Sequence, residues 1–211
     1  MDVDTFERWT RRSALLGLAG FIVVVTQGLA RSRRHAKGRV SGPAAGSLRW
    51  LRAAYVPMSF VALWGLGKSW RPLPVSLSPA ARFVATVAGA KLFFLGLGLF
   101  LWGRRTMGDM YDLSSSLGAE LYADHRLVTS GPFALVRHPL YLAGILAEVG
   151  ALLLFRNWAM ALVALNAPTL ILRARTEETL LAAEFGPQWA EYKTRVPMLL
   201  PRLGGCCADE G

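Results

Sequence analysis

The chain has 211 residues, of which 53% are hydrophobic, and it carries a formal net charge of +10 at pH 7. Soluble domains of this length are more polar, so the composition predicts one integral membrane domain. In a soluble protein this charge would point to nucleic acid, but here the Lys and Arg residues lie beside apolar segments. That pattern is typical of membrane loops in contact with anionic lipid, so we expect membrane lipids as partners and no nucleic acid.

Five apolar segments follow one another along the chain: 13–30, 53–67, 80–103, 139–155 and 157–172. A spanning helix needs about 20 apolar residues, so the third segment is comfortably long and the second is short. Only Arg156 and its neighbours separate the last two segments, which predicts a tight helical hairpin. The predicted fold class is all-α, an integral membrane bundle of about five transmembrane helices.

The first segment has a second interpretation as a signal peptide, because Gly28-Leu29-Ala30 resembles a small-residue cleavage site. The apolar run is long for that role, and acidic residues precede it at Asp2, Asp4 and Glu7. We therefore expect a retained helix.

The distribution of Lys and Arg predicts the orientation in the membrane. With five spans, the basic regions 31–52, 104–137 and 173–202 fall on one side, and this richer side should be cytoplasmic. The N-terminus is then outside and the C-terminus inside. The Ala-, Leu-, Arg- and Gly-rich usage hints at a bacterial inner membrane, so we expect a multi-pass protein of that membrane.

We expect three regions: N-terminal helices in 1–103, a core in 104–203 and a short tail in 204–211. The core combines a long cytoplasmic loop, the helical hairpin and an amphipathic helix over 176–192 that is broken at Gly186-Pro187. The tail holds Cys206 and Cys207, which are too close for an ordinary disulfide. They have no His or Cys partners at zinc spacing, so no metal is expected.

His138-Pro139 marks the start of the fourth apolar helix. Proline at a first helical position costs no hydrogen bond, and the free N–H groups there can hold an anion. Tyr141 and Phe133 offer aromatic faces that attract a cation such as a sulfonium. Taken alone, the motif is equally typical of a capped helix with interfacial aromatic residues.

Arg173 and Glu177 form the second motif, directly after the fifth apolar segment. They are four residues apart and share one helix face, whereas Glu178 points elsewhere. Alone, this motif is typical of a solvated charged turn. Both motifs should nevertheless lie on the cytoplasmic side, where a water-soluble cofactor can meet a lipid-like substrate.

Together the two segments resemble the isoprenylcysteine carboxyl methyltransferase family. The resemblance rests on the run from His125 to Tyr141, His-Arg-Leu-Val-Thr-Ser-Gly-Pro-Phe-Ala-Leu-Val-Arg-His-Pro-Leu-Tyr, and on Arg173-Ala-Arg-Thr-Glu-Glu. It continues with Phe185-Gly-Pro-Gln-Trp-Ala-Glu-Tyr and Arg195-Val-Pro. It covers about 124–201, whereas 1–103 is similar only in being apolar helices.

The resemblance implies a membrane methyltransferase that holds S-adenosylmethionine in a cytoplasmic pocket outside any Rossmann fold. It implies that Arg173 and Glu177 are catalytic, with Arg173 orienting the substrate. The expected cofactor-binding residues are His125, Arg126, Leu127, Val128, Phe133, His138, Pro139, Leu140, Tyr141, Glu177 and Glu178.

Three features depart from the family pattern. Phe133 stands where Tyr is usual, so a hydroxyl contact is lost while ring stacking survives. Ala143 stands where Gly is usual, with Gly144 beside it, which narrows the room for helix packing. The stretch 106–121 matches nothing in the family.

The expected reaction is methyl transfer to a hydrophobic, lipid-like or prenylated acceptor, with carboxyl O-methylation as the default. A carboxylate needs no base, whereas a phenol or amine must lose a proton, and His138 and Glu148 are the nearest candidates in sequence. Methylation of a phospholipid amine or phenolic lipid remains open. So do an NADPH-dependent sterol-reductase-like enzyme and a non-enzymatic membrane adaptor or transporter subunit.

Lys91 and Glu148 are the charged residues nearest the middle of the third and fourth apolar helices. Each would cost about 3 kcal/mol at the bilayer centre if it were unpaired. We therefore predict that the two residues pair or line a polar cavity. The alternative is that the helices sit off-centre and Lys91 extends its ammonium group to the interface.

Overall fold

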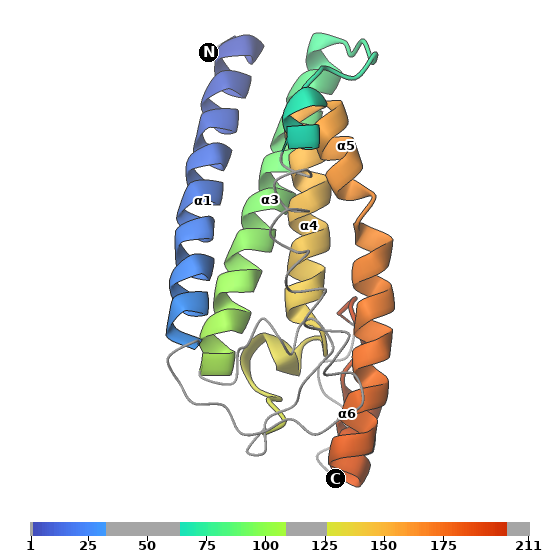
Figure 1. Cartoon of the computed structure of the whole chain (residues 1–211). Coiled ribbons are helices and arrows are strands. Elements are labelled where there is room, and N and C mark those ends of the chain that lie inside the picture. The colour runs from blue at the N-terminus through green and yellow to red at the C-terminus, as the bar shows by residue number, and fades with distance from the viewer. Residues whose placement is uncertain (1, 33–63, 109–125, 202–211) are drawn as a thin grey trace.

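The computed structural model describes residues 2–32, 64–108 and 126–201. Its helices are α1 (Val3–Ser32), α3 (Pro79–Met107), the 3-10 helix η3 (Gly131–Ala134), α4 (Pro139–Phe155), α5 (Trp158–Ala164) and α6 (Ala167–Arg195). The helices run alongside one another (Figure 1). In the described part of the chain, the β-structure is one isolated bridge between Pro72 and Asn157. The expected all-α class is confirmed.

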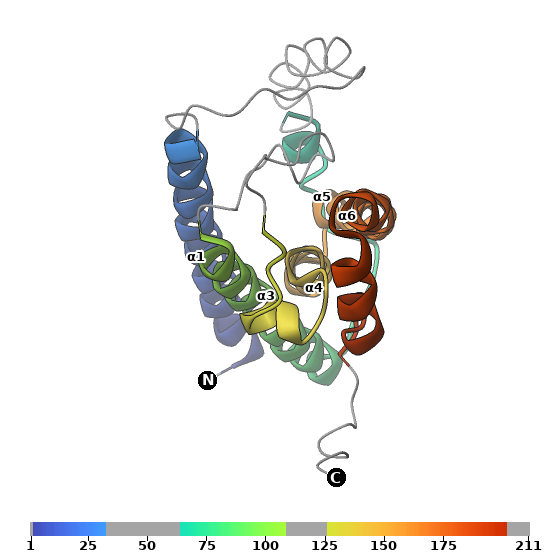
Figure 2. The same cartoon turned by 90° about the horizontal axis from the view of Figure 1, so that it is seen from below.

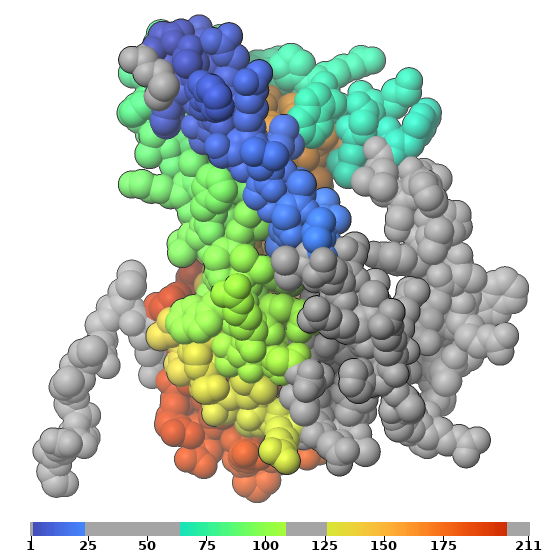
Figure 3. All heavy atoms as spheres, turned by 90° about the vertical axis from the view of Figure 1, so that its left-hand side faces the viewer, coloured from blue at the N-terminus to red at the C-terminus, as the bar shows by residue number. Residues whose placement is uncertain are grey.

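Helix α3 is long and apolar enough to cross a membrane, and α4 is a shorter apolar helix of 17 residues. Both follow the predicted segments closely, and α1 contains the first. The second segment lies largely outside the described residues, so the total of five spans stays a prediction. Helices α1 and α3, blue and green in Figure 3, expose large apolar side chains such as Leu16, Val84 and Leu95. Such surfaces suit a hydrocarbon environment.

Local sequence signals set the helix ends. The Ser78 hydroxyl accepts a hydrogen bond from the Ala81 N–H at 3.3 Å at the start of α3, and Pro79 occupies the first turn. Helix α4 ends at Arg156, which adopts a left-handed conformation with φ 46°. The Asn157 side chain then caps α5 by accepting from the Met160 N–H at 2.8 Å.

The fifth apolar segment is not one helix as predicted. It is divided into α5 and α6 by a break at Leu165 and Asn166. Pro168 explains the break, because it lacks an N–H group and its ring clashes with the preceding turn of a continuous helix. Helix α6 then runs on to Arg195 as a single element with a kink at Gly186, where φ is 48°. The break at Gly186 in the predicted amphipathic helix is therefore confirmed.

Glycine brings the backbones of α3 and α4 into direct contact. A Cβ atom added at Gly96 would lie 2.6 Å from the Ala143 carbonyl oxygen, and one added at Gly150 would clash with the Phe93 backbone. Small residues allow such close approach between membrane helices. Ala143 is itself only 1% exposed, and this alanine is accommodated because Gly96 faces it across the interface.

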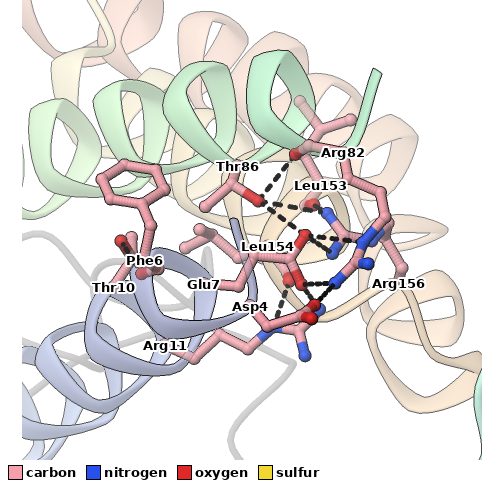
Figure 4. A network of polar contacts seen from close by, with 10 residues as sticks. All are labelled: Asp4, Phe6, Glu7, Thr10, Arg11, Arg82, Thr86, Leu153, Leu154 and Arg156. Carbon is pink, nitrogen blue, oxygen red and sulfur yellow. Dashed lines mark hydrogen bonds and ion pairs between the residues drawn. The ribbon is translucent and has the colours of Figure 1, made fainter. Parts of the chain in front are cut away.

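A buried carboxylate joins α1 to this pair at the end of the bundle where the N-terminus lies (Figures 1 and 4). Glu7 is 3% exposed and contacts Arg82 at 2.9 Å, Arg156 at 2.6 Å and Arg11 at 3.5 Å. The Arg11 Nε also donates to the Leu154 carbonyl at 2.7 Å. We call Glu7 and these three arginines the Glu7 cluster. It fixes the start of α1 against α3 and the end of α4.

Candidate cofactor site at the start of α4

The predicted site residues gather at the opposite end of the bundle. Here α3 ends, η3 leads into α4, and the last part of α6 lies beside them (Figure 2). His138 occupies the N-cap position of α4 without a side-chain capping bond, and Pro139 lies in the first turn. Both residues are buried. The imidazole of His138 therefore faces the protein interior rather than its own helix end.

The His138 ring lies between the two adjacent acids of α6. Its Nδ1 is 3.8 Å from Glu177 Oε2, and its Nε2 is 3.4 Å from Glu178 Oε1. The Tyr141 ring is next to it, with ring centroids 5.7 Å apart. Tyr141 also hydrogen-bonds Glu177. The structure thus brings both sequence motifs into one group, although they lie on different helices.

Glu177 and Glu178 occupy different environments. Glu177 is 30% exposed in its side chain, and burial raises its pKa, opposed by the charge of His138 and the hydrogen bond from Tyr141. Burial also disfavours the ionised form of Glu178, but hydrogen bonds from His138 and Arg137 outweigh it and lower the pKa to about 2. Glu178 is therefore a firmly ionised partner of protein cations, and its predicted contact with the cofactor is not favoured by this geometry.

Arg173 lies on the exposed surface of α6, one turn before Glu177. Its positive charge acts on the Tyr141 hydroxyl, which places the guanidinium near the same group. Arg173 is thus accessible from outside while remaining close to the buried residues, as the predicted substrate-orienting role requires.

Two of the predicted cofactor-binding residues in the segment before α4 pack against other parts of the protein. Leu127 packs against a buried cluster of Trp189, Tyr192 and Val196, and Phe133 is only 9% exposed. Sequence reasoning did not assign this packing role. The signal was the helical spacing of Phe185, Trp189 and Tyr192, which places one aromatic stripe on the last turns of α6.

Three further predicted residues have no described contact with Glu177 or Glu178. Leu140 packs against Gly103 of α3, Arg126 is exposed, and Val128 is half-buried. His125 lies outside the described residues. The described group that can act together is therefore His138, Tyr141, Arg173 and Glu177, with Glu178 behind His138.

The predicted pairing of Lys91 with Glu148 is wrong. Glu148 accepts a hydrogen bond from the Asn166 side chain at 2.9 Å, at the break between α5 and α6. Lys91 is exposed on α3. The two helices turn these residues toward different neighbours, so similar depth in the membrane does not bring them together. The exposed position suits the alternative in which the Lys91 ammonium extends toward the interface.

The described residues fit S-adenosylmethionine, the expected cofactor. Glu177 supplies a carboxylate for a cationic ligand, and the Tyr141 ring offers a face for a sulfonium. Trp189 Nε1 is buried without a hydrogen-bond partner among the described residues, whereas His138 Nε2 faces Glu178 Oε1 at 3.4 Å. Buried polar atoms are normally paired, so Trp189 Nε1 is available to a polar ligand.

Comparison with known proteins agrees with this site. Residues 90–183 match the model of the isoprenylcysteine carboxyl methyltransferase family. The chain is 42% identical over 82 residues to the cobalt-zinc-cadmium resistance protein CzcN of Cupriavidus metallidurans, covering 38% of each chain. It is 31% identical over 118 residues to the protein-S-isoprenylcysteine O-methyltransferase of Schizosaccharomyces pombe, covering 53% of this chain and 48% of the relative.

A third relative is methanethiol S-methyltransferase 2 of Bradyrhizobium diazoefficiens. It is 30% identical over 159 residues, which cover 72% of this chain and 60% of the relative. The chain therefore spans between about two fifths and three fifths of the length of these relatives. The family uses S-adenosylmethionine, and its matched region contains His138, Tyr141, Arg173 and Glu177. Over residues 90–183 the chain is therefore similar to the isoprenylcysteine carboxyl methyltransferase family.

Proposed function

We propose that this protein transfers a methyl group from S-adenosylmethionine to a hydrophobic acceptor at the cytoplasmic membrane face. The observation that carries the proposal is the group of His138, Tyr141 and Glu177 at one end of apolar helices, with His138 Nδ1 3.8 Å from Glu177. The match of residues 90–183 to the isoprenylcysteine carboxyl methyltransferase family supports methyl transfer over the NADPH-dependent reductase and the adaptor.

The chain's residues would act mainly by positioning and by electrostatics. When bound, S-adenosylmethionine supplies an electrophilic methyl group. Glu177 would supply a negative charge for the cationic ligand, and the Tyr141 ring would offer a face for the sulfonium. The buried His138 and Pro139 keep water from this side of the site. Positioning of this kind can supply several kcal/mol of the barrier reduction.

A carboxylate is the default acceptor. Arg173 is exposed and one helical turn from Glu177, so its guanidinium can hold a carboxylate by two parallel hydrogen bonds. The carboxylate is already ionised and needs no base. The name of the Schizosaccharomyces pombe relative supports O-methylation of a prenylcysteine-like acid.

A thiol is the second candidate acceptor, and the position of His138 favours it. A thiol must lose its proton as the carbon–sulfur bond forms, and a neutral His138 that donates from Nε2 to Glu178 would keep Nδ1 as the nitrogen that receives this proton. The name of the Bradyrhizobium relative supports S-methylation. Release of the thioether then leaves the proton on the imidazole, from which it returns to water.

Calorimetric titration of the detergent-purified protein with S-adenosylmethionine and with NADPH tests the proposal. We expect binding of S-adenosylmethionine, lost in Glu177→Gln and kept in Glu191→Gln, because Glu191 is 71% exposed on the same helix. Binding of NADPH alone, or of neither compound, would contradict the proposal.

Labelled methyl transfer then identifies the acceptor. A prenylcysteine with a free carboxylate, an alkanethiol and a phospholipid amine serve as the three test acceptors. A base-labile methyl ester supports the carboxylate, whereas a base-stable thioether supports the thiol. Arg173→Gln should impair the first reaction strongly and the second only weakly.

A further inference from the structure

The chain that follows the kink of α6 returns to the start of α4. After Gly186 the last turns of α6 change direction, and residues 192–198 lie beside the start of α4 (Figure 2). The Arg137 N–H donates to the Pro197 carbonyl at 2.8 Å, and the His138 N–H donates to the Met198 carbonyl at 3.1 Å. We call residues 192–198 the C-terminal strap. The backbone of His138 is therefore fixed by the strap as well as by α4.

A second contact holds the strap to η3. The Tyr192 hydroxyl donates to the Phe133 carbonyl at 2.6 Å, and Tyr192 is 3% exposed. The strap thus bonds to three positions in the segment that precedes α4, namely 133, 137 and 138. Movement of the strap would necessarily move His138.

Arg137 connects the strap to α6. Its side chain is 7% exposed, and its Nε donates to Glu178 Oε1 at 2.8 Å. Its Nη1 donates to the carbonyls of Lys193 and Val196. The guanidinium also lies 5.8 Å from the centre of the Trp189 ring. One planar group therefore contacts two parts of α6 and the strap.

The contacts leave Arg137 little opportunity to touch a ligand. Its guanidinium nitrogens all donate to protein oxygens, and the side chain is almost fully enclosed. Lysine cannot replace it, because an ammonium group lacks the rigid fork that reaches a carboxylate and two carbonyls in different directions. Removing the guanidinium would leave Glu178 with His138 Nε2 and with the half-exposed Lys193 Nζ, each at 3.4 Å.

Arg137 also orients the Glu177 side chain, because it holds the adjacent residue Glu178. Holding the Glu178 carboxylate fixes the rotation of α6 about its axis at this turn. That rotation places Glu177 against His138 and Tyr141. The same guanidinium therefore supports both sides of the cofactor site, the imidazole through the strap and the carboxylate through α6.

We propose that Arg137 is a positioning residue, which sets His138 and Glu177 for cofactor binding by holding the C-terminal strap and Glu178, without touching cofactor or acceptor. The inference rests on the proposed function, because it concerns the same site. It assigns a functional reason to the arginine that precedes His138 and to the strap.

The test compares Arg137→Lys and Arg137→Gln with Arg195→Gln. Arg195 is a matched control because it is 68% exposed and pairs with Glu191 on the same last turns of α6. Full-length variants are purified in detergent, and samples that unfold cooperatively are titrated with S-adenosylmethionine. Misplacement of a site by about 1 Å can cost about a hundredfold. We expect cofactor affinity about ten- to a hundredfold weaker in both Arg137 variants and unchanged in Arg195→Gln.

Steady-state kinetics separate positioning from general destabilisation. The KM for S-adenosylmethionine should rise while the KM for the acceptor stays within about threefold, because Arg173 is not held by the strap. Ethylguanidinium added to Arg137→Ala should restore part of the cofactor affinity. If Arg137 had only a structural role, its replacement would lower the unfolding temperature. It would not raise the KM for S-adenosylmethionine selectively, and ethylguanidinium would not restore cofactor affinity.

Several outcomes would overturn the inference. Folded Arg137 variants that bind S-adenosylmethionine as tightly as the parent would show that the strap does not position the site. Should the Arg137 variants fail to fold, Tyr192→Phe loosens the other end of the strap without leaving a buried charge, and parent affinity in that variant overturns the inference. The parent is titrated first, and a parent that does not bind S-adenosylmethionine overturns the proposed function together with the inference.

Discussion

Replacing Glu177 and Glu178 of α6 one at a time by Gln should affect different properties. One replacement should weaken binding of S-adenosylmethionine, and the other should lower the stability of the fold. Glu178 is paired with buried Arg137, and a pKa lowered from 4.5 to about 2 corresponds to about 3 kcal/mol of stabilisation at neutral pH. Glu178→Gln should lose about that amount, which for a chain of this size is roughly 6–12 °C in unfolding temperature. Glu177 has a raised pKa, so its ionised form does not stabilise the fold, and Glu177→Gln should unfold within about 2 °C of the parent.

Thermal unfolding and cofactor titration of the same detergent samples test this contrast. Glu177→Gln should keep its unfolding temperature and lose S-adenosylmethionine affinity, whereas Glu178→Gln should show the larger fall in unfolding temperature. Glu191→Gln, on the exposed part of the same helix, should change neither quantity. Equal unfolding temperatures for the Glu177 and Glu178 variants would refute the assignment of different roles to these acids.

Three further predictions concern stability. The contribution of Glu178 to the free energy of unfolding is complete above its unfolded pKa near 4.5 and is lost as the pH falls toward 2. The unfolding temperature of Glu178→Gln should therefore depend less on pH in that range than the unfolding temperature of the parent. Glu7→Gln leaves three arginines around a neutral group and should cost about 3–5 kcal/mol, measured by denaturant unfolding; a loss below about 1 kcal/mol would argue against the Glu7 cluster as an anchor. Gly150→Ala should cost at least about 1–3 kcal/mol by separating α3 from α4, whereas Gly98→Ala, with open space around it, should be nearly neutral in the same assay.

Helices α3 and α4 were predictable because their signals are local. An apolar run of sufficient length, with Pro139 or a capping Ser78 at its start, determines a helix whatever its partners are. That His138 and Glu177 belong to one site was expected from resemblance to a family rather than from spacing, and their roles in cofactor binding stay predictions. Spacing alone placed Arg173 and Glu177 on one face but did not indicate which helix that face meets.

Other features depend on contacts between distant parts of the chain. The Lys91–Glu148 prediction failed because hydropathy gives depth in the membrane but not the rotation of each helix. The break before α6 carried a visible signal in Pro168, which was outweighed by the apolar character of its neighbours. The C-terminal strap had no such signal, because its bonds to Arg137 join residues about 60 positions apart.

The backbone contact between α3 and α4 has a consequence for how an acceptor travels. Where Gly96 and Gly150 let the two backbones touch, no acyl or prenyl chain can thread between these helices. A lipid-like acceptor must therefore approach along another border of α4. Helix α6 forms such a border, and the break that precedes it at 165–166 and its own kink at Gly186 make it the more deformable helix. Entry of the acceptor and release of the methylated product should accordingly depend on bending of α6 rather than on separation of α3 from α4.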